Sequence, residues 1–192
     1  MKRIKSTFLA LVLLSPMAAN ADLIVGEVHM AGGSATPVDN SGIFGTLDAA
    51  TGIDFSSPGF VTTGGTADFA AVPFAIPVTF NDFTFNPSIA VNPLWTFNFD
   101  SGMRSFSFAA TSFTVDVQTT STLGITASGF LSGTGYEDTV ASWTFAMDQV
   151  GGLFGWSSTT VAGTVTTVPE PGTLALLGIG LFGMGLARCK KT

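Results

Sequence analysis

The chain has 192 residues, of which 46% are hydrophobic and 10% are charged, and its formal net charge is −6. Most positive charge lies near the two ends, because residues 22–167 carry twelve acidic residues against Arg104 alone, a formal net charge of −11. A surface this negative repels phosphate backbones, which argues against nucleic-acid binding. The single cysteine, Cys189, lies close to the C-terminus. Residues 22–167 therefore contain no disulfide and depend on packing for stability.

The first 21 residues have the organisation of a secretory signal peptide. Three basic residues within the first five precede an apolar stretch at 8–14, and small residues follow at Ala19 and Ala21. This order predicts cleavage after Ala21, and the apolar stretch is too short to span a membrane as a helix. We therefore expect the export translocon to carry residues 22–167 out of the cytoplasm.

The next part of the chain predicts short β elements. Residues 23–30 form the first clear strand pattern, whereas residues 31–75 are interrupted by glycine pairs and prolines. Such interruptions are typical of loops and brief edge strands. No stretch of residues 22–167 carries a helical period.

Three later segments alternate apolar and polar residues with a period of two, which predicts half-buried antiparallel strands. Their apolar members are Trp95, Phe97 and Phe99, then Phe113, Val115 and Val117, then Trp143, Phe145 and Met147. Asp100-Ser101-Gly102 predicts a hairpin connection, and Gly133-Thr134-Gly135 and Gly151-Gly152 predict turns. We expect one all-β domain over 22–167, an antiparallel β-sandwich of about 8 to 10 strands.

The same residues argue against an enzyme. Residues 22–167 hold one histidine, His29, and neither lysine nor cysteine, which excludes cysteine nucleophiles, lysine Schiff bases and histidine-rich zinc sites. We expect His29 to face solvent between Val28 and Met30. A small hydrolase using two carboxylates is the least favoured alternative, because Glu137 and Asp138 follow a glycine-rich turn and suit an exposed loop.

Two binding functions stay open as alternatives. Glycan binding would use aromatic side chains, and Tyr136 and Trp156 are the candidates because they adjoin glycine-rich turns, whereas Trp95 and Trp143 are in phase with core residues. Calcium would use the oxygen-rich turns at 39–42 and 64–68, although local backbone hydrogen bonds also explain aspartate and asparagine there. We expect no other cofactor and no other metal.

The last 25 residues form a third region. The motif Val168-Pro169-Glu170-Pro171-Gly172 is followed by fifteen uncharged residues at 173–187, and the tail 188–192 contains Arg188, Lys190 and Lys191. The prolines favour an extended, accessible backbone at the motif. As a helix, 173–187 would reach roughly 22 Å at about 1.5 Å per residue, somewhat less than the roughly 30 Å hydrocarbon core. The basic residues would hold the end in the cytoplasm and stop transfer.

This order of motif, apolar run and basic end resembles the C-terminal sorting signal of PEP-CTERM proteins, exported proteins of Gram-negative bacteria. The resemblance covers residues 168–192 only, and Cys189 departs from the usual basic tail. It implies transient membrane insertion through 173–187, with residues 22–167 on the periplasmic side. It also implies that an exosortase-type membrane enzyme recognises the motif and cleaves near Pro169-Glu170-Pro171. An uncleaved membrane anchor is the alternative.

The resemblance leads to a functional expectation. We expect the mature protein at the cell surface or secreted, as a non-enzymatic structural or adhesive component of the extracellular polysaccharide matrix, the biofilm exopolysaccharide, or the cell envelope. A carbohydrate- or calcium-binding module is the alternative. The domain organisation expected is thus a signal peptide at 1–21, an exported β body at 22–167 and a sorting signal at 168–192.

Overall fold

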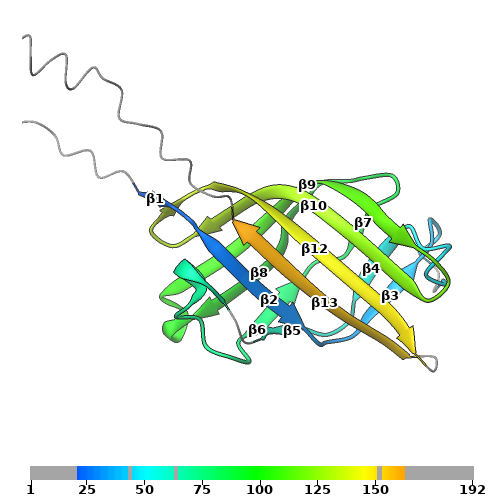
Figure 1. The fold of residues 1–192 in the computed structure, drawn as a ribbon, viewed down its shortest axis with the longest axis horizontal. Helices are drawn as coiled ribbons and strands as arrows, with labels where there is room; N and C mark the ends of the chain where they lie inside the picture. Colours follow the sequence, from blue (N-terminus) through cyan, green and yellow to red (C-terminus); the bar gives the residue numbers. More distant parts are fainter. Residues whose placement is uncertain (1–20, 43–44, 63–64, 151–152, 163–192) are drawn as a thin grey trace, which may run out of the picture.

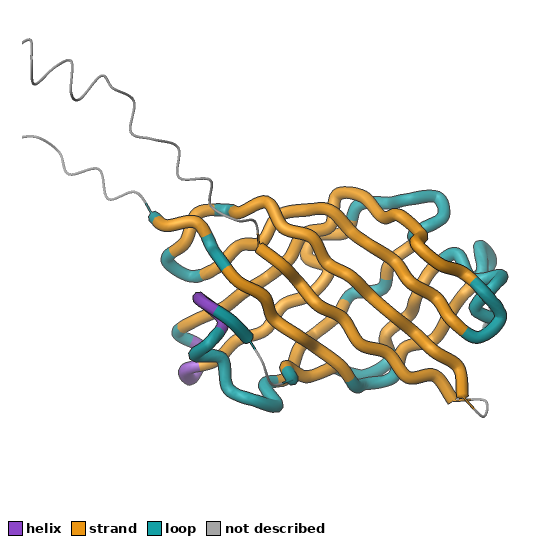
Figure 2. The backbone as a smooth tube through the Cα atoms, in the orientation of Figure 1, coloured by secondary structure: helices purple, strands orange, loops and turns teal. Residues whose placement is uncertain are grey.

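The computed structural model describes residues 21–42, 45–62, 65–150 and 153–162, which are all-β (Figure 1, Figure 2). In chain order the strands are β1 (Asp22–Leu23), β2 (Gly26–Ala31), β3 (Ala35–Val38), β4 (Gly52–Phe55), β5 (Gly59–Val61), β6 (Pro77–Phe80), β7 (Phe83–Thr84), β8 (Val91–Phe99), β9 (Arg104–Gln118), β10 (Thr122–Gly133), β11 (Tyr136–Glu137), β12 (Thr139–Val150) and β13 (Leu153–Ala162). The helical elements of these ranges are two 3-10 turns, η2 (Ala67–Phe69) and η3 (Asp100–Gly102). Neither has the length or apolar run that crossing a bilayer requires. The predicted sorting helix at 173–187 and nearly all of the signal peptide lie outside the described residues.

Eight strands form a closed barrel in the order β10-β12-β13-β2-β5-β6-β8-β9, and every neighbouring pair is antiparallel. The prediction of antiparallel β structure is therefore confirmed, but the predicted two-sheet sandwich is replaced by one closed sheet. Register shifts in the β9–β10 and β8–β9 pairs are sites where the sheet bends. Bulges of this kind increase local twist and curvature, and closure leaves the long strands without free edges.

The alternation predicted from the sequence is present in β8 and β12. Trp143, Phe145 and Met147 are buried, and the residues between them are exposed. The prediction for the end of β9 is wrong: Phe113 is buried, but Val115 and Val117 are 36% and 42% exposed. Val115 pairs with Ile125 and Val117 with Gly124, so the residue between them has no partner across the ladder. This bulge turns Val117 to the opposite face, which breaks the period of two.

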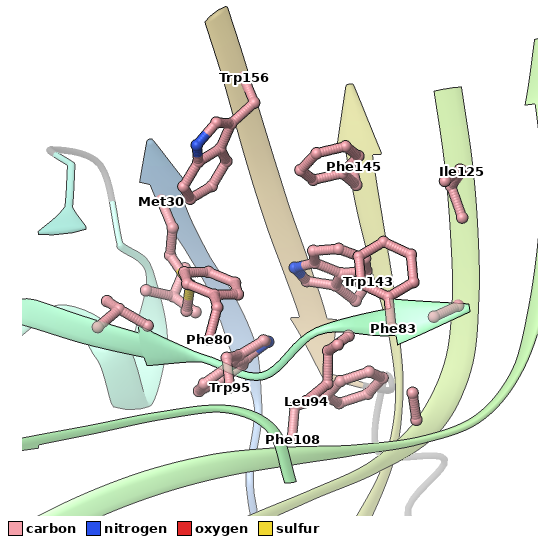
Figure 3. Close-up of a cluster of buried hydrophobic side chains, with 14 of the residues drawn as sticks. Met30, Phe80, Phe83, Leu94, Trp95, Phe108, Ile125, Trp143, Phe145 and Trp156 are labelled. Atoms are coloured by element: carbon pink, nitrogen blue, oxygen red, sulfur yellow. The ribbon is translucent and has the colours of Figure 1, made fainter. Parts of the chain in front are cut away.

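Aromatic side chains fill the inside of the barrel. Around Phe83, ring centroids lie 4.8 Å from Phe113, 5.6 Å from Trp143 and 6.0 Å from Phe145. A second group surrounds Trp95 and Phe106. An eight-stranded barrel is about wide enough for side chains to occupy its interior, and Figure 3 shows labelled core residues projecting inward from opposite walls.

The two ends of the barrel differ. At one end, which we call the tether end, the chain enters through β1 and leaves after β13, on the left in Figure 1. Strand β1 pairs in parallel with β11 there, and η2 places the buried ring of Phe69 against Phe106. At the other end, the distal end, the small sheet β3-β4-β7 lies beside the mouth of the barrel.

Several local predictions are confirmed. Residues 100–102 connect β8 to β9, and Thr134-Gly135 form the turn between β10 and β11. Residues 31–75 form short elements, as expected, whereas the strand predicted at 23–30 is divided into β1 and β2. The predicted turn at Gly151-Gly152 lies outside the described residues.

Candidate functional site

The sorting residues predicted from the sequence lie outside the described residues. These are Val168, Pro169, Glu170 and Pro171 of the motif, Arg188, Lys190 and Lys191 of the tail, and Ala19 of the signal peptide. The structure does show the point from which the C-terminal region continues. Strand β13 ends at Ala162, which pairs with Gly26 at the tether end. Only residues 163–167 separate Ala162 from the motif, so the tether end is the end of the barrel from which the chain continues to the motif.

A polar cluster stabilises the tether end. Asp68 accepts a hydrogen bond from the Val25 N–H at 2.8 Å and one from the Tyr136 hydroxyl at 3.2 Å. Burial, followed by the charge of Asp68, raises the pKa of Tyr136, and Arg104 acts in the opposite direction. The guanidinium carbon of Arg104 lies 4.9 Å from the centre of the Phe99 ring. The only basic residue of 22–167 is thus engaged at this end.

The outside of the barrel carries rows of hydroxyl groups. In one row, Thr114, Thr126, Thr144 and Thr159 occupy paired positions on β9, β10, β12 and β13. In the next row, Ser112, Ser128 and Ser142 pair in the same way. All seven side chains are exposed or half-buried. Neighbouring strands are about 4.8 Å apart and these rows about 6.8 Å apart, so the seven residues form one polar surface, which we call the hydroxyl face.

Part of this face is already ordered by hydrogen bonds within the protein. The Thr126 hydroxyl donates to Asp116 at 2.7 Å, and the Thr144 hydroxyl donates to the Thr159 carbonyl at 3.3 Å. His29 continues the threonine row onto β2, where its Nδ1 lies 2.9 Å from the Thr159 hydroxyl. Its Nε2 is 3.6 Å from a carboxylate oxygen of Glu27. His29 is expected from the sequence to face solvent between Val28 and Met30; it lies on the outer side of β2 between these two buried residues and is half-buried.

An exposed apolar row borders the hydroxyl face on its tether side. Phe130 and Val140 pair directly across β10 and β12 and are 45% and 67% exposed. Val161, opposite Ser142 on β13, adds a third exposed apolar side chain. Phe130 is therefore an aromatic ring presented to solvent beside Ser128 and Ser142. Sequence reasoning missed it, although it lies out of phase with the buried residues Ile125, Ala127 and Leu131 of the same strand.

The aromatic residues predicted to contact a glycan are placed differently. Trp156 is only 7% exposed, and its ring contacts Phe80 and Phe55 inside the barrel. It lines a groove of about 500 Å³ near the distal end, but it presents little surface there. Tyr136 is half-buried and bonded to Asp68. The expectation that these two rings form an exposed pair is therefore wrong, because inward alternation along β13 buries Trp156. Trp95 and Trp143 are buried, as expected.

The acidic turns have local explanations. Asp39 accepts a hydrogen bond from the Ser41 N–H at 2.8 Å, as an aspartate in a turn commonly does, and Asp68 is bonded as described above. The described residues contain no group of three or more metal-ligating side chains of histidine, cysteine, aspartate or glutamate. Glu137 and Asp138 are exposed, as expected, and Asp138 accepts from the Ser132 hydroxyl at 2.6 Å.

At the distal end, the carboxylate of Asp54 has a shifted pKa. Burial, followed by repulsion from Asp82, raises the pKa of Asp54. Asp82 itself accepts a hydrogen bond from the Phe55 N–H at 2.7 Å. Both side chains are exposed, so this pair belongs to the surface of the small sheet and not to a cleft.

Comparison with known proteins bears on the C-terminal region. The family model of the PEP-CTERM protein-sorting motif matches residues 167–191. The match agrees with the predicted motif, apolar run and basic tail. No curated protein and no solved structure matches the chain. The C-terminal region therefore carries a PEP-CTERM protein-sorting motif, which indicates an exported protein that an exosortase membrane enzyme processes.

Proposed function

We propose that the protein is a non-enzymatic structural or adhesive component of the extracellular polysaccharide matrix or cell envelope. The observation that carries this proposal is the hydroxyl face with Phe130 at its border, displayed on an exported and strongly acidic body. Export delivers the body to a compartment rich in polysaccharide, and the face supplies a surface on which an uncharged polysaccharide can bind.

The chemistry of this surface suits a neutral sugar chain. Serine and threonine hydroxyls donate and accept hydrogen bonds, as sugar hydroxyls do. The apolar face of a sugar can pack against an exposed aromatic ring. A few polar groups beside an apolar surface are the usual composition of a ligand site. The net charge of −11 on residues 22–167 disfavours acidic polysaccharides unless a divalent cation bridges the two.

The arrangement of ionisable residues supports a role without catalysis. His29 is engaged with Thr159 and Glu27 on the outer wall. Glu137 and Asp138 are neighbours in one exposed segment, where they do not flank a bound sugar from two sides as a glycosidase requires.

In our proposal the signal peptide exports the chain, residues 173–187 insert transiently, and cleavage near Pro169-Glu170-Pro171 discards the C-terminal segment. The tether end then faces the membrane before cleavage, and the side wall with the hydroxyl face is accessible. Glu170 serves in recognition by the processing enzyme. Replacing Pro169, Glu170 and Pro171 by alanine should leave the precursor in the membrane. Appearance of the same variant outside the cell without its tail would contradict this part.

To test binding, the exported protein is passed over a column of insoluble neutral glucan, and its retention is measured. We expect Phe130→Ala to lower the affinity by roughly tenfold, the usual cost of truncating an anchoring side chain. Phe74→Ala is the matched control, since Phe74 is 64% exposed in the connection between η2 and β6, away from the face.

A parallel column of acidic polysaccharide, with and without calcium, distinguishes the alternatives. We expect no retention without calcium. Calcium-dependent retention that Phe130→Ala leaves unchanged would favour the calcium-binding alternative. Equal loss in the two phenylalanine variants, or no retention on neutral glucan, would contradict adhesion through the hydroxyl face.

A further inference from the structure

The inner face of β13 carries a line of polar atoms within an otherwise apolar core. Trp156, Ser158 and Thr160 are consecutive inward-facing residues, and they are 7%, 4% and 0% exposed. The indole nitrogen of Trp156 and both hydroxyls are buried and have no hydrogen-bond partner within the described part of the chain. Inward positions on one strand are about 6.8 Å apart, so the three groups follow the barrel wall in sequence.

A fourth unpartnered atom joins this line from the next strand. Trp143 on β12 lies directly opposite Thr160, and its indole nitrogen is also buried without a partner. Figure 3 shows this nitrogen on the side of the ring toward β13. We call these four residues, Trp143, Trp156, Ser158 and Thr160, the inner polar seam. The indole nitrogen of Trp95 is unpartnered as well, but it belongs to β8 and lies outside the seam.

The described residues that pair with Ser158 and Thr160 on β2, and with Ser158 on β12, are apolar and cannot complete the seam. On one side, Met30 and Val28 of β2 pair with Ser158 and Thr160. On the other side, Phe145 of β12 pairs with Ser158. All three are at most 1% exposed. A buried polar group without any partner lowers the ratio of folded to unfolded protein by roughly ten- to a hundredfold. Four such groups in one line would therefore strongly destabilise the folded state.

The chemistry of the four atoms defines their partner. An indole N–H only donates, whereas a hydroxyl donates and accepts. The partner must therefore accept from two indoles and must also satisfy two hydroxyls. It must be small, because closely packed apolar side chains flank the seam. A water molecule has this size and makes two to four hydrogen bonds in such sites.

We infer that the inner polar seam is a binding site for a line of internal water molecules, which bridge Trp143 to Thr160 and Ser158 to Trp156. Water-mediated bonds are nearly as favourable as direct ones. They hold the two indole rings against β13 from inside the barrel. The seam thus explains why serine and threonine occupy inward positions where valine or alanine would otherwise suit the core.

The test compares Thr160→Val with Thr139→Val in the exported protein. Thr139 is a buried threonine whose hydroxyl has hydrogen-bond partners in the protein. It accepts from the Ile24 N–H at 2.8 Å and donates to the Glu137 carbonyl at 3.0 Å. If water satisfies Thr160, both variants should be less stable, and each should raise the unfolding equilibrium constant by roughly tenfold. Urea titration followed by tryptophan fluorescence measures this. An unchanged or more stable Thr160→Val variant would overturn the inference.

A second readout separates water from an undetected protein partner. In nuclear magnetic resonance, the indole proton of Trp143 should show a cross-relaxation signal with long-lived water, and Thr160→Val should remove it. Ser158→Ala is a smaller change and should remove the corresponding signal of Trp156. This variant replaces Thr160→Val in the test if Thr160→Val does not fold. Destabilised variants together with no water signal in the unaltered protein would overturn the inference, because the partner would then be a protein atom.

Discussion

Gln118 at the end of β9 gives a quantitative test of how the distal end is held. Its side-chain amide donates to the carbonyl oxygens of Leu47 and Ala50, both at 2.8 Å. These two residues are buried in the loop between β3 and β4, at 0% and 3% exposure. One side chain thus fixes this loop to the barrel wall.

Gln118→Met keeps the length of the side chain and removes the donor. Each intramolecular hydrogen bond contributes about 1 kcal/mol, so the loss of both predicts a decrease of about 2 kcal/mol in the free energy of unfolding. For a domain of this size that corresponds to a decrease of about 8 °C in Tm, at about 4 °C per kcal/mol. Thermal unfolding followed by tryptophan fluorescence is suitable, because all three tryptophans lie within 22–162.

Gln149→Met is the matched control. Gln149 lies near the same end on β12, and its backbone N–H, not its side chain, makes the hydrogen bond, to the Ser121 carbonyl. We expect a change below about 0.5 kcal/mol there, as for ordinary surface substitutions. Equal Tm values for the two variants would refute the claim that Gln118 fastens the loop.

Two further predictions concern the tether end and the β9–β10 ladder. The pKa of Tyr136 is raised above 10.0 in the folded protein. The contribution of Tyr136 to stability should therefore be present below about pH 10 and lost as the pH rises through the raised value. Urea midpoints should fall at alkaline pH, and Tyr136→Phe should flatten that fall. Equal slopes for both proteins would contradict the assigned cause. Gly129→Ala should prevent normal folding, since a Cβ atom there would clash with the Ala109 carbonyl oxygen of the backbone. Native-like circular dichroism and Tm in that variant would show that β9 and β10 are not this close.

Much of the strand content could be predicted because burial on one face leaves a period of two in the sequence. Trp143, Phe145 and Met147 show this clearly, and the structure buries all three. Barrel closure could not be predicted in the same way. A sandwich and a barrel both require one inward and one outward face per strand. The difference depends on the register shifts near Thr111 and Asp116, which lie beside Gly129 and Gly124 of the neighbouring strand, and a glycine in a strand does not by itself indicate closure.

The candidate surface was only partly predictable, for a related reason. Proximity to a glycine-rich turn suggested that Tyr136 and Trp156 were exposed, but alternation along β13 places Trp156 inside. The same alternation along β10 identifies Phe130 as an outward aromatic residue. Phase within a strand was thus a better guide to exposure than distance from a turn. The hydroxyl rows depend on which residues pair across four strands, and that register comes only from the structure.

The central claim is that the C-terminal segment is discarded and that the exported body acts alone. Intact-mass spectrometry of the protein collected from the cell surface or medium tests it most directly. We predict an N-terminus at Asp22 and a C-terminus close to Pro169-Glu170-Pro171. A surface-located protein whose mass includes every residue through Thr192 would contradict the claim.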